Sequence, residues 1–235
     1  SLYEGGGSSG FGIGGGGSNA VNRMVQTRLK GVDFIAVNTD LQALRMSAAP
    51  ERMQIGEKLT KGLGAGSNPE VGKNAAIEST EQIAEALKGT DILFLTAGFG
   101  GGTGTGATPA IAKIARDMDI LTIAVITKPF TFEGSRRALQ AFEGIKILRE
   151  SCDTIICIPN DRLLEYTTAE TSLLSAFHLI DDILSQSIQS VSNLLIKPGL
   201  INLDFADVRT ILAEKGGTLL GFGEGAGRNK AMLAA

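Results

Sequence analysis

Four short apolar runs, each rich in β-branched residues, alternate along the chain with segments of helical spacing. The runs cover residues 32–37 (VDFIAV), 91–97 (DILFLTA), 120–127 (ILTIAVIT) and 154–159 (TIICIP). Apolar runs of this length are typical of strands that are buried on both faces. Strands that alternate with helices form parallel sheets covered on both sides. We therefore predict an α/β fold with a doubly wound, mainly parallel, Rossmann-like sheet.

The segments between and after these runs carry helical patterns. The first four cover residues 19–29, 68–87, 108–118 and 135–152. A longer pattern, 172–196, places apolar residues at spacings of three and four, and Pro198-Gly199 stops it. We expect helices on both faces of the sheet and one long central helix after the last strand.

Composition narrows the class of protein. Of the 235 residues, 43% are hydrophobic and 20% are charged, which suffices for a large core. The formal net charge of -3 offers no basic surface for nucleic acid. No apolar run approaches the roughly 18 residues of a membrane span, and residues 1–10 lack the basic and apolar regions of a signal peptide. We therefore expect a cytoplasmic protein with no nucleic-acid partner and no direct membrane insertion.

The two cysteines, Cys152 and Cys157, are spaced C-x4-C, and no histidine clusters with them. This spacing supports neither a metal site nor redox chemistry. We interpret both cysteines as small buried hydrophobic residues, and we predict no metal held by protein side chains.

A glycine-rich segment follows the apolar run 91–97. Six of the nine residues from Gly98 to Gly106 are glycine. One interpretation is a flexible linker, but linkers have polar flanks, and this segment lies between an apolar run and a helical pattern. The other is close approach: without Cβ atoms, successive N–H groups can converge on an anion at the start of a helix. We favour this second interpretation, a phosphate-binding loop.

Three further segments are expected at the same edge of the sheet. Residues 14–20 (GGGGSNA) lead into the first helix, residues 38–40 (NTD) end a strand, and residues 62–70 form another glycine-rich loop. Parallel sheets bind ligands at the carboxyl ends of their strands, so these segments indicate a ligand with several phosphates. The letters G-x-G-x-x-G of dinucleotide-binding proteins occur at 10–15, but GGGSS before them is a poor strand, and the P-loop pattern is absent. A dinucleotide oxidoreductase therefore remains only an alternative.

Seven separated motifs, in the same order, resemble the tubulin/FtsZ family, in particular its bacterial and plastid FtsZ members. They are GGGGSNAVNRM (14–24), AVNTD (36–40), GLGAGSNPE (62–70), GGGTGTG (100–106), PFTFEGSRR (129–137), IPNDRLL (158–164) and GLINLDFADVR (199–209). The resemblance runs from about Phe11 to the C-terminus and implies a GTPase domain that binds GTP and GDP.

The resemblance also implies which residues hold the nucleotide. Those expected at the phosphates are Gly15, Gly16, Gly17, Gly100, Gly101, Gly102, Thr103 and Gly104, with Asn38 nearby and with Ala65 and Gly66 at the γ-phosphate. Because neither glycine-rich loop contains a lysine, backbone dipoles and a Mg²⁺ bound through the phosphates would neutralise the charge. Glu133 and Arg137 match the contacts to the ribose and the nearby phosphate region.

Base selection is implied in the same way. Asn19, Asn160 and Asp181 match the family's base-contacting positions, and an aspartate can accept hydrogen bonds from two groups of guanine that adenine lacks. Phe177 lies four residues before Asp181 on the long helix, so its ring can stack on the base from the same face. Core packing is the alternative role for Phe177.

The last motif matches the loop that polarises the attacking water, with Asn202, Asp204 and Asp207 as catalytic residues. Their alternative role is to cap the helix that follows. At 1.5 Å per residue, the long helix separates these residues from Asp181 by roughly 20–30 Å. We therefore expect hydrolysis to be completed at the interface between two subunits.

These implications together predict a GTPase that polymerises head to tail into the division ring of a cell or plastid. Its partners would be copies of itself and, through regions missing here, division-site proteins, in the cytoplasm or the plastid stroma. The alternative is a non-hydrolysing filament or a regulatory paralogue. Family members continue past Ala235 into a full second domain, so the sequence leaves open whether the chain is a fragment.

The predicted organisation has four parts. We expect a disordered arm or an expression linker over residues 1–10, and a GTP-binding domain over 11–171. The central helix would cover 172–198. The catalytic loop and the truncated start of a second, α+β domain would cover 199–235. The glycines before Phe11 also predict a weakened first strand.

Overall fold

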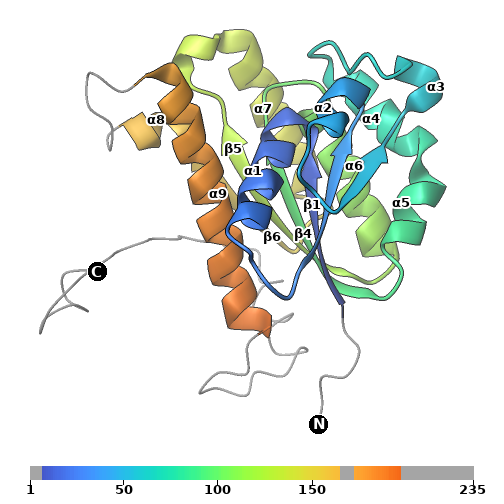
Figure 1. The fold of residues 1–235 in the computed structure, drawn as a ribbon. Helices are drawn as coiled ribbons and strands as arrows, with labels where there is room; N and C mark the ends of the chain where they lie inside the picture. Colours follow the sequence, from blue (N-terminus) through green and yellow to red (C-terminus); the bar gives the residue numbers. More distant parts are fainter. Residues whose placement is uncertain (1–6, 165–171, 197–235) are drawn as a thin grey trace, which may run out of the picture.

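Six parallel strands in the order β3-β2-β1-β4-β5-β6 form the centre of the computed structural model, which describes residues 7–164 and 172–196 (Figure 1). The strands are β1 (Gly7–Ile13), β2 (Asp33–Asn38), β3 (Glu51–Gln54), β4 (Thr90–Gly98), β5 (Leu121–Lys128) and β6 (Thr154–Pro159). Every neighbouring pair is parallel. The predicted α/β fold with a doubly wound parallel sheet is confirmed.

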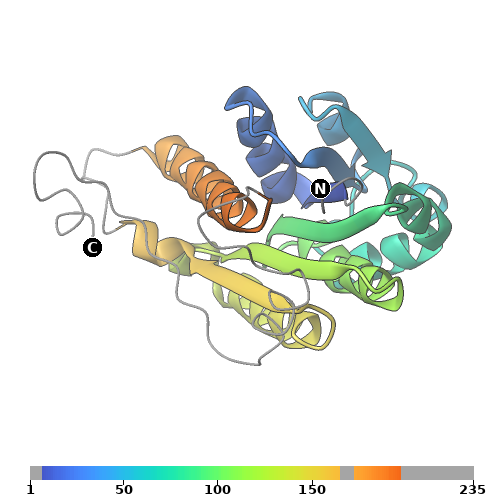
Figure 2. The ribbon, with the colours of Figure 1, turned by 90° about the horizontal axis from the view of Figure 1, so that it is seen from below.

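Helices cover both faces of this sheet (Figure 2). They are α1 (Gly14–Gln26), α2 (Leu41–Arg45), α3 (Glu57–Thr60), α4 (Pro69–Glu78), α5 (Thr80–Ala86), α6 (Thr103–Asp117), α7 (Ser135–Leu148), α8 (Asn160–Leu164) and α9 (Leu173–Ile196), with a short 3-10 helix, η1 (Thr131–Glu133). One buried cluster joins the sheet to α4, α5, α6 and α7, and the other joins it to α1 and α9. The described part of the chain contains no helix long and apolar enough to cross a membrane.

The first strand differs from its prediction. Residues 7–10 belong to β1, which lies between β2 and β4, so a disordered arm or linker over residues 1–10 is wrong for these four residues. Ser9 on this strand shares a 2.8 Å hydrogen bond with Thr90 on β4. The strand is therefore central, and its residues 9–13 pair with strands on both sides rather than forming a weakened strand.

Gly10 and Gly12 of β1 are explained by the groups that pack against this strand. A Cβ on Gly12 would lie 2.4 Å from the carbonyl oxygen of Gly17 in α1, and a Cβ on Gly10 would lie 2.7 Å from the ring of Phe34. Phe11 points to the opposite face, where it is fully buried. Gly12 therefore lets the backbone of α1 rest directly on the strand backbone, and Gly10 leaves room for the ring of Phe34.

The order of the strands places a crevice between β1 and β4. From β1 the chain passes through α1 to β2 on one side, and from β4 it passes through α6 to β5 on the other. At such a reversal the two helices leave the carboxyl edge of the sheet in opposite directions, which opens a space between their starts. The starts of α1 and α6 lie at this point.

Two smaller expectations concern the cysteines and the C-terminal part. Cys152 and Cys157 are free thiols packed against the larger buried cluster, and burial raises the pKa of the Cys157 thiol, which fits their interpretation as hydrophobic residues. The long central helix is present as α9. The catalytic loop and second domain expected over 199–235 lie outside the described residues.

Candidate functional site

A cavity of about 380 Å³ opens at the carboxyl ends of β1, β4 and β5. Its lining consists of Gly14, Gly15, Gly16, Asn19, Gly98, Phe99, Gly101, Gly102, Thr103, Gly104, Thr127, Pro129, Glu133, Arg137, Asn160, Phe177, Ile180, Asp181 and Leu184. Twelve of the seventeen residues predicted to hold the nucleotide are in this set. The exceptions are Gly17, Asn38, Ala65, Gly66 and Gly100. The predicted catalytic residues Asn202, Asp204 and Asp207 lie outside the described residues.

Two helix N-termini meet at one side of the cavity. The residues before α1 and α6, Ile13 and Gly102, provide no side-chain cap, whereas Asp40 and Asn68 cap α2 and α4 with their side chains. The first N–H groups of a helix have no partner inside it and carry partial positive charge. The starts of α1 and α6 can therefore bind the same polyanion.

Glycine is required where these two helices approach each other. Gly14 has a φ of +70°, and a Cβ there would lie 2.9 Å from the Gly104 nitrogen. A Cβ on Gly104 would lie 2.6 Å from the carbonyl oxygen of Gly98. Residues 14–20 are the first turns of α1, so their expected loop conformation is wrong, although they do border the cavity.

Two predicted residues outside the cavity have structural roles. Gly17 allows α1 to touch β4, because a Cβ there would lie 2.3 Å from the Thr96 carbonyl oxygen. The Asn38 carboxamide oxygen accepts hydrogen bonds from the N–H groups of Thr39 (2.8 Å) and Asp40 (3.2 Å). Asn38 therefore shapes the turn between β2 and α2.

The remaining three predicted residues lie in the loops beside the start of α6. A Cβ on Gly102 would lie 2.7 Å from the Ala65 Cβ, so the loop at 62–66 packs against the residue before α6. Gly66 is exposed, with a φ of +56°. The N–H of Gly100 donates to Thr105 Oγ1 at 2.8 Å, which fixes the glycine-rich loop onto its own helix.

The opposite side of the cavity contains aromatic and acidic side chains from α9. Phe177 is 39% exposed, and its ring meets the buried ring of Phe130 edge to face at 5.5 Å between centroids. One face of Phe177 is therefore available to a planar ligand. Asn160 Oδ1 is buried and has no hydrogen-bond partner among the described residues, so it can accept from a bound group.

Asp181 is half-buried one turn after Phe177. The pKa of its carboxyl is raised to about 6, mainly by burial and also by the neighbouring Asp182 carboxylate, whereas His178 and Arg23 act in the opposite direction. A carboxylate kept partly out of water accepts hydrogen bonds strongly once it is ionised. Asp181 is therefore suited to bind a donor pair on a ligand at neutral pH.

Glu133 and Arg137 form an ion pair at the rim. Arg137 NH1 donates to Glu133 Oε2 at 2.6 Å, and Glu133 Oε1 accepts from the Phe130 N–H at 2.9 Å. Asp161 holds the same segment by accepting from the N–H and hydroxyl of Thr131, and these hydrogen bonds lower the pKa of Asp161. The arrangement fixes the Arg137 guanidinium at the cavity.

Seven lining residues were missed by sequence reasoning. They are Gly14, Gly98, Phe99, Thr127, Pro129, Ile180 and Leu184. Five of them lie in or beside the quoted motifs, and Ile180 and Leu184 follow Phe177 and Asp181 at spacings of three on α9. That spacing was the signal available for the last two.

The metal prediction concerns side-chain ligands. Across residues 7–164 and 172–196, no group of three or more His, Cys, Asp or Glu residues could hold a metal ion. The donor set of the cavity consists mainly of N–H groups, which bind anions rather than cations.

Comparisons with known proteins match the fold. The tubulin/FtsZ family, GTPase domain, matches residues 10–168. An empty FtsZ dimer from M. jannaschii is similar with a TM-score of 0.92 and 39% identity, over 99% of this chain and 67% of that chain. A mutant FtsZ from the same organism gives 0.90 and 40%, over 96% and 68%. A GTPγS-bound CetZ2 protofilament from Haloferax volcanii shares the fold, with a TM-score of 0.73 and 22% identity over 87% and 62% of the two chains.

Proposed function

The chain belongs to the tubulin/FtsZ family, and from this premise we propose that it binds GTP, hydrolyses it and assembles head to tail into filaments. The observation that carries the proposal is the cavity at the carboxyl end of the sheet. Two uncapped helix starts form its anion-binding side, and the aromatic ring and carboxylate of α9 form the other. A nucleoside triphosphate is complementary to both sides, because it has a polyanion at one end and a planar base at the other.

The triphosphate binds at the starts of α1 and α6 in this proposal. The backbone of Gly15, Gly16 and Gly101 lines that side with no side chain in the way. A Mg²⁺ ion bound through the phosphates would offset their negative charge. Arg137 lies at the rim, where its guanidinium can pair with a phosphate.

The base binds between Phe177 and the other α9 residues. Guanine presents an N1–H and an exocyclic amine on one edge, and the two oxygens of the ionised Asp181 can accept from both. Adenine lacks this donor pair, so it would leave a buried carboxylate unpaired. Asn160 Oδ1 offers a further acceptor. The site should therefore prefer GTP to ATP.

Hydrolysis requires groups that orient a water molecule at the γ-phosphate. Asn202, Asp204 and Asp207 are the candidates, and they follow the end of α9 at Ile196. Fifteen residues of helix separate Asp181 from Ile196, which corresponds to about 22 Å. We propose that a neighbouring subunit brings these residues to the nucleotide, a contact that repeats head to tail and builds a filament.

We also propose the cellular role that the sequence indicates, a filament of the division ring in the cytoplasm or the plastid stroma. Two FtsZ structures support it through their identity of 39% and 40% to this chain, and the first of them is a dimer. Division-site proteins would bind the polymer through regions outside this sequence.

The test measures bound nucleotide, turnover and assembly of the purified chain. We expect GTP or GDP rather than ATP in the extracted nucleotide, phosphate release from GTP, and pelleting that depends on GTP. Phosphate release per chain should rise with protein concentration. Binding and assembly without phosphate release would indicate a non-hydrolysing filament or regulatory paralogue, and nicotinamide binding without GTP binding would overturn the proposal.

A further inference from the structure

Thr39 lies at a junction beside the phosphate side of the cavity and is fully buried. Its N–H donates to Asn38 Oδ1 at 2.8 Å, and its hydroxyl shares a 2.7 Å hydrogen bond with the Thr103 hydroxyl. Its carbonyl oxygen accepts from the Gly64 N–H and the Thr60 hydroxyl, both at 3.3 Å. Every polar atom of this one residue is therefore engaged, each with a different segment of the fold.

A bound ligand would fix which of the two hydroxyls, Thr39 or Thr103, donates the hydrogen bond between them. Thr103 is the first residue of α6 and lines the cavity. A hydroxyl group has one proton to donate. If the Thr103 hydroxyl donates to a phosphate oxygen, the Thr39 hydroxyl must be the donor between the two threonines. The order is then Thr39 to Thr103 to phosphate, and each hydrogen bond polarises the next.

The carbonyl of Thr39 holds the loop at 62–66. Gly64 donates to that carbonyl, and Ala65 packs where a Cβ on Gly102 would otherwise fit. A shift of Thr103 toward a phosphate therefore moves the group that anchors this loop. The packing is too close to absorb the shift in empty space, because Thr39 has no exposed surface.

We propose that Thr39 is a positioning residue that orients the Thr103 hydroxyl toward the phosphate and couples the start of α6 to the loop at 62–66. The inference rests on the proposed nucleotide site and assigns a role to a residue that does not line the cavity. Thr39 acts through Thr103 and through its own carbonyl, and it does not touch the nucleotide.

The first test compares Thr39→Val with Thr39→Ser. Valine keeps the shape but removes the hydroxyl, and serine keeps the hydroxyl but removes the methyl group. We expect Thr39→Val to weaken GTP and GDP binding about three- to tenfold, because one charge-assisted hydrogen-bond chain loses its first donor. Thr39→Ser should bind within about twofold of the wild type. Affinity is measured with a fluorescent GTP analogue on the whole 235-residue chain.

The matched control is Thr90→Val. Thr90 is also buried, and its hydroxyl pairs with that of Ser9 at 2.8 Å, but at the amino ends of the strands. This variant should lose stability without losing nucleotide affinity. Melting temperatures of all three variants separate a folding defect from a binding defect, and Thr39→Ser keeps the test informative if Thr39→Val does not fold.

The second test measures hydrogen exchange of the segment 62–68 with and without GDP. Nucleotide should slow exchange in the wild type and in Thr39→Ser but not in Thr39→Val at saturating GDP. Equal affinities for wild type and Thr39→Val, or a loss as large in Thr39→Ser, would overturn the inference. A wild-type chain that binds no nucleotide would instead overturn the proposed function.

Discussion

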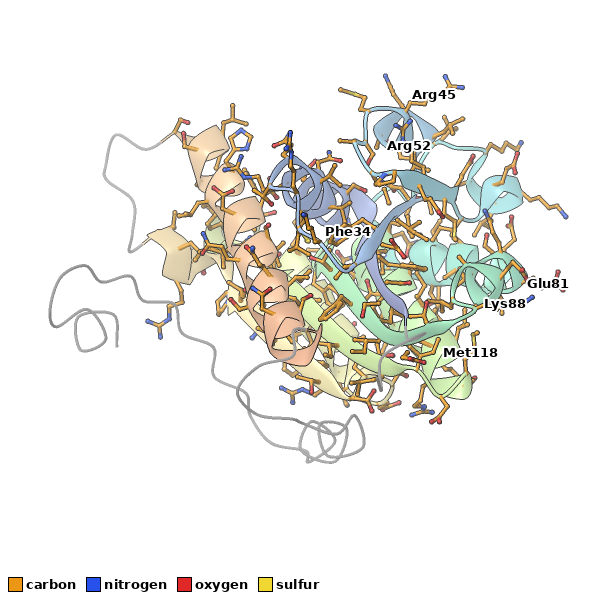
Figure 3. The ribbon with its side chains drawn as sticks, turned by 60° about the horizontal axis from the view of Figure 1, so that its bottom comes forward. Phe34, Arg45, Arg52, Glu81, Lys88 and Met118 are labelled. Atoms are coloured by element: carbon orange, nitrogen blue, oxygen red, sulfur yellow. The ribbon has the colours of Figure 1, made fainter. Side chains whose placement is uncertain are left out.

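The two ends of the parallel sheet contain cavities of almost equal volume, about 380 Å³ at the carboxyl end and about 390 Å³ at the amino end. The amino-end cavity is lined by Gly7, Ser9, Val25, Arg28, Leu29, Val32, Asp33, Phe34, Ile35, Pro50, Glu51, Ala86, Lys88, Gly89 and Thr90. Figure 3 labels two of these residues, Phe34 and Lys88. Volume alone therefore does not distinguish the candidate site.

The difference lies in what each end presents to a ligand. Helices α1 and α6 begin at the carboxyl-end cavity, whereas α1 and α5 end near the amino-end cavity, where helix termini carry partial negative charge. The amino end nevertheless has the cations Arg28 and Lys88 in its lining, balanced by Asp33 and Glu51. Helix direction and a bare backbone therefore distinguish the carboxyl-end cavity as an anion site, more than the number of basic side chains does.

The largest expected effect tests the close packing at the carboxyl end. A Cβ on Gly106 would lie 1.8 Å from the Pro69 carbonyl oxygen, so Gly106→Ala must push α4 and α6 apart. We expect a loss of about 3 kcal/mol or more in the free energy of unfolding. At the amino end, Gly89→Ala meets no atom within 4 Å and suffers only from its φ of +76°. That variant should lose about 1 kcal/mol. Urea unfolding followed by circular dichroism measures both, and equal losses would contradict the comparison.

The next effect concerns base recognition. Asp181→Asn should weaken GTP binding by about 1–3 kcal/mol, roughly 5- to 150-fold, because the amide cannot accept from both donors of guanine. Its preference for GTP over ATP should fall with it. The matched control is Asp33→Asn in the amino-end cavity, which should change neither quantity. Competition binding with both nucleotides is the measurement, and an unchanged preference in Asp181→Asn would refute the assignment.

The pH dependence of binding should follow the raised pKa of Asp181, about 6. Only the ionised carboxylate accepts both hydrogen bonds, so GTP affinity should rise about tenfold between pH 5 and pH 7. Because the phosphates also titrate, the measured quantity is the difference between the wild type and Asp181→Asn. An identical pH profile for the two proteins would contradict this prediction.

Without nucleotide, the Asp181 carboxyl should make the folded chain less stable as the pH rises, whereas GTP affinity increases with pH. Its pKa in the folded chain is raised from 3.8 to about 6, so the folded state disfavours ionisation. The raised pKa therefore adds to the stability of the folded chain. This contribution is fully present below pH 4 and is lost as the pH rises through 6. Urea midpoints of the wild type minus those of Asp181→Asn at pH 4, 5 and 7 test this. A difference that grows with pH would contradict it.

The smallest effects are expected from the cations of the amino end. Arg28→Gln and Lys88→Gln should leave GTP affinity unchanged, because these side chains lie at the opposite edge of the sheet. Lys88 forms an exposed ion pair with Glu85, so its removal should cost less than about 1 kcal/mol. Binding isotherms and urea midpoints measure these values. A tenfold loss of GTP affinity in either variant would instead place phosphate binding at the amino end of the sheet.

The sequence predicted the fold where the apolar runs were continuous and missed strands where they were not. β1 was predicted only as a weakened strand, because Gly12 makes room for α1 and Gly10 for the ring of Phe34, contacts that appear only when these neighbours are in place. β3 was missed because it has four residues, and Glu51 and Arg52 in it are exposed at the sheet edge. Period and composition describe one segment at a time, whereas these strands depend on their neighbours.

The candidate site shows the same division. The motifs placed five of the eight predicted glycines at one cavity, because these glycines directly follow strands, and the shared face of the long helix placed Phe177 and Asp181 there. They did not reveal that Asn38 binds the backbone of its own turn, nor that Thr39 meets Thr103. Those two threonines are 64 residues apart in the sequence, so their contact is set by the order of the strands and not by local spacing.

The glycine backbone at the starts of α1 and α6 has a consequence for the entropy of binding. When a lysine binds a phosphate, several of its side-chain torsions become fixed, and the lost conformational entropy costs up to about 2 kcal/mol. The N–H groups of Gly15, Gly16 and Gly101 have no torsions of that kind to freeze, and the strand beneath α1 already holds the helix start in place. Preorganised donors lower the ordering cost of association. The side of the cavity formed by these helix starts therefore loses its conformational entropy on folding, before any ligand arrives.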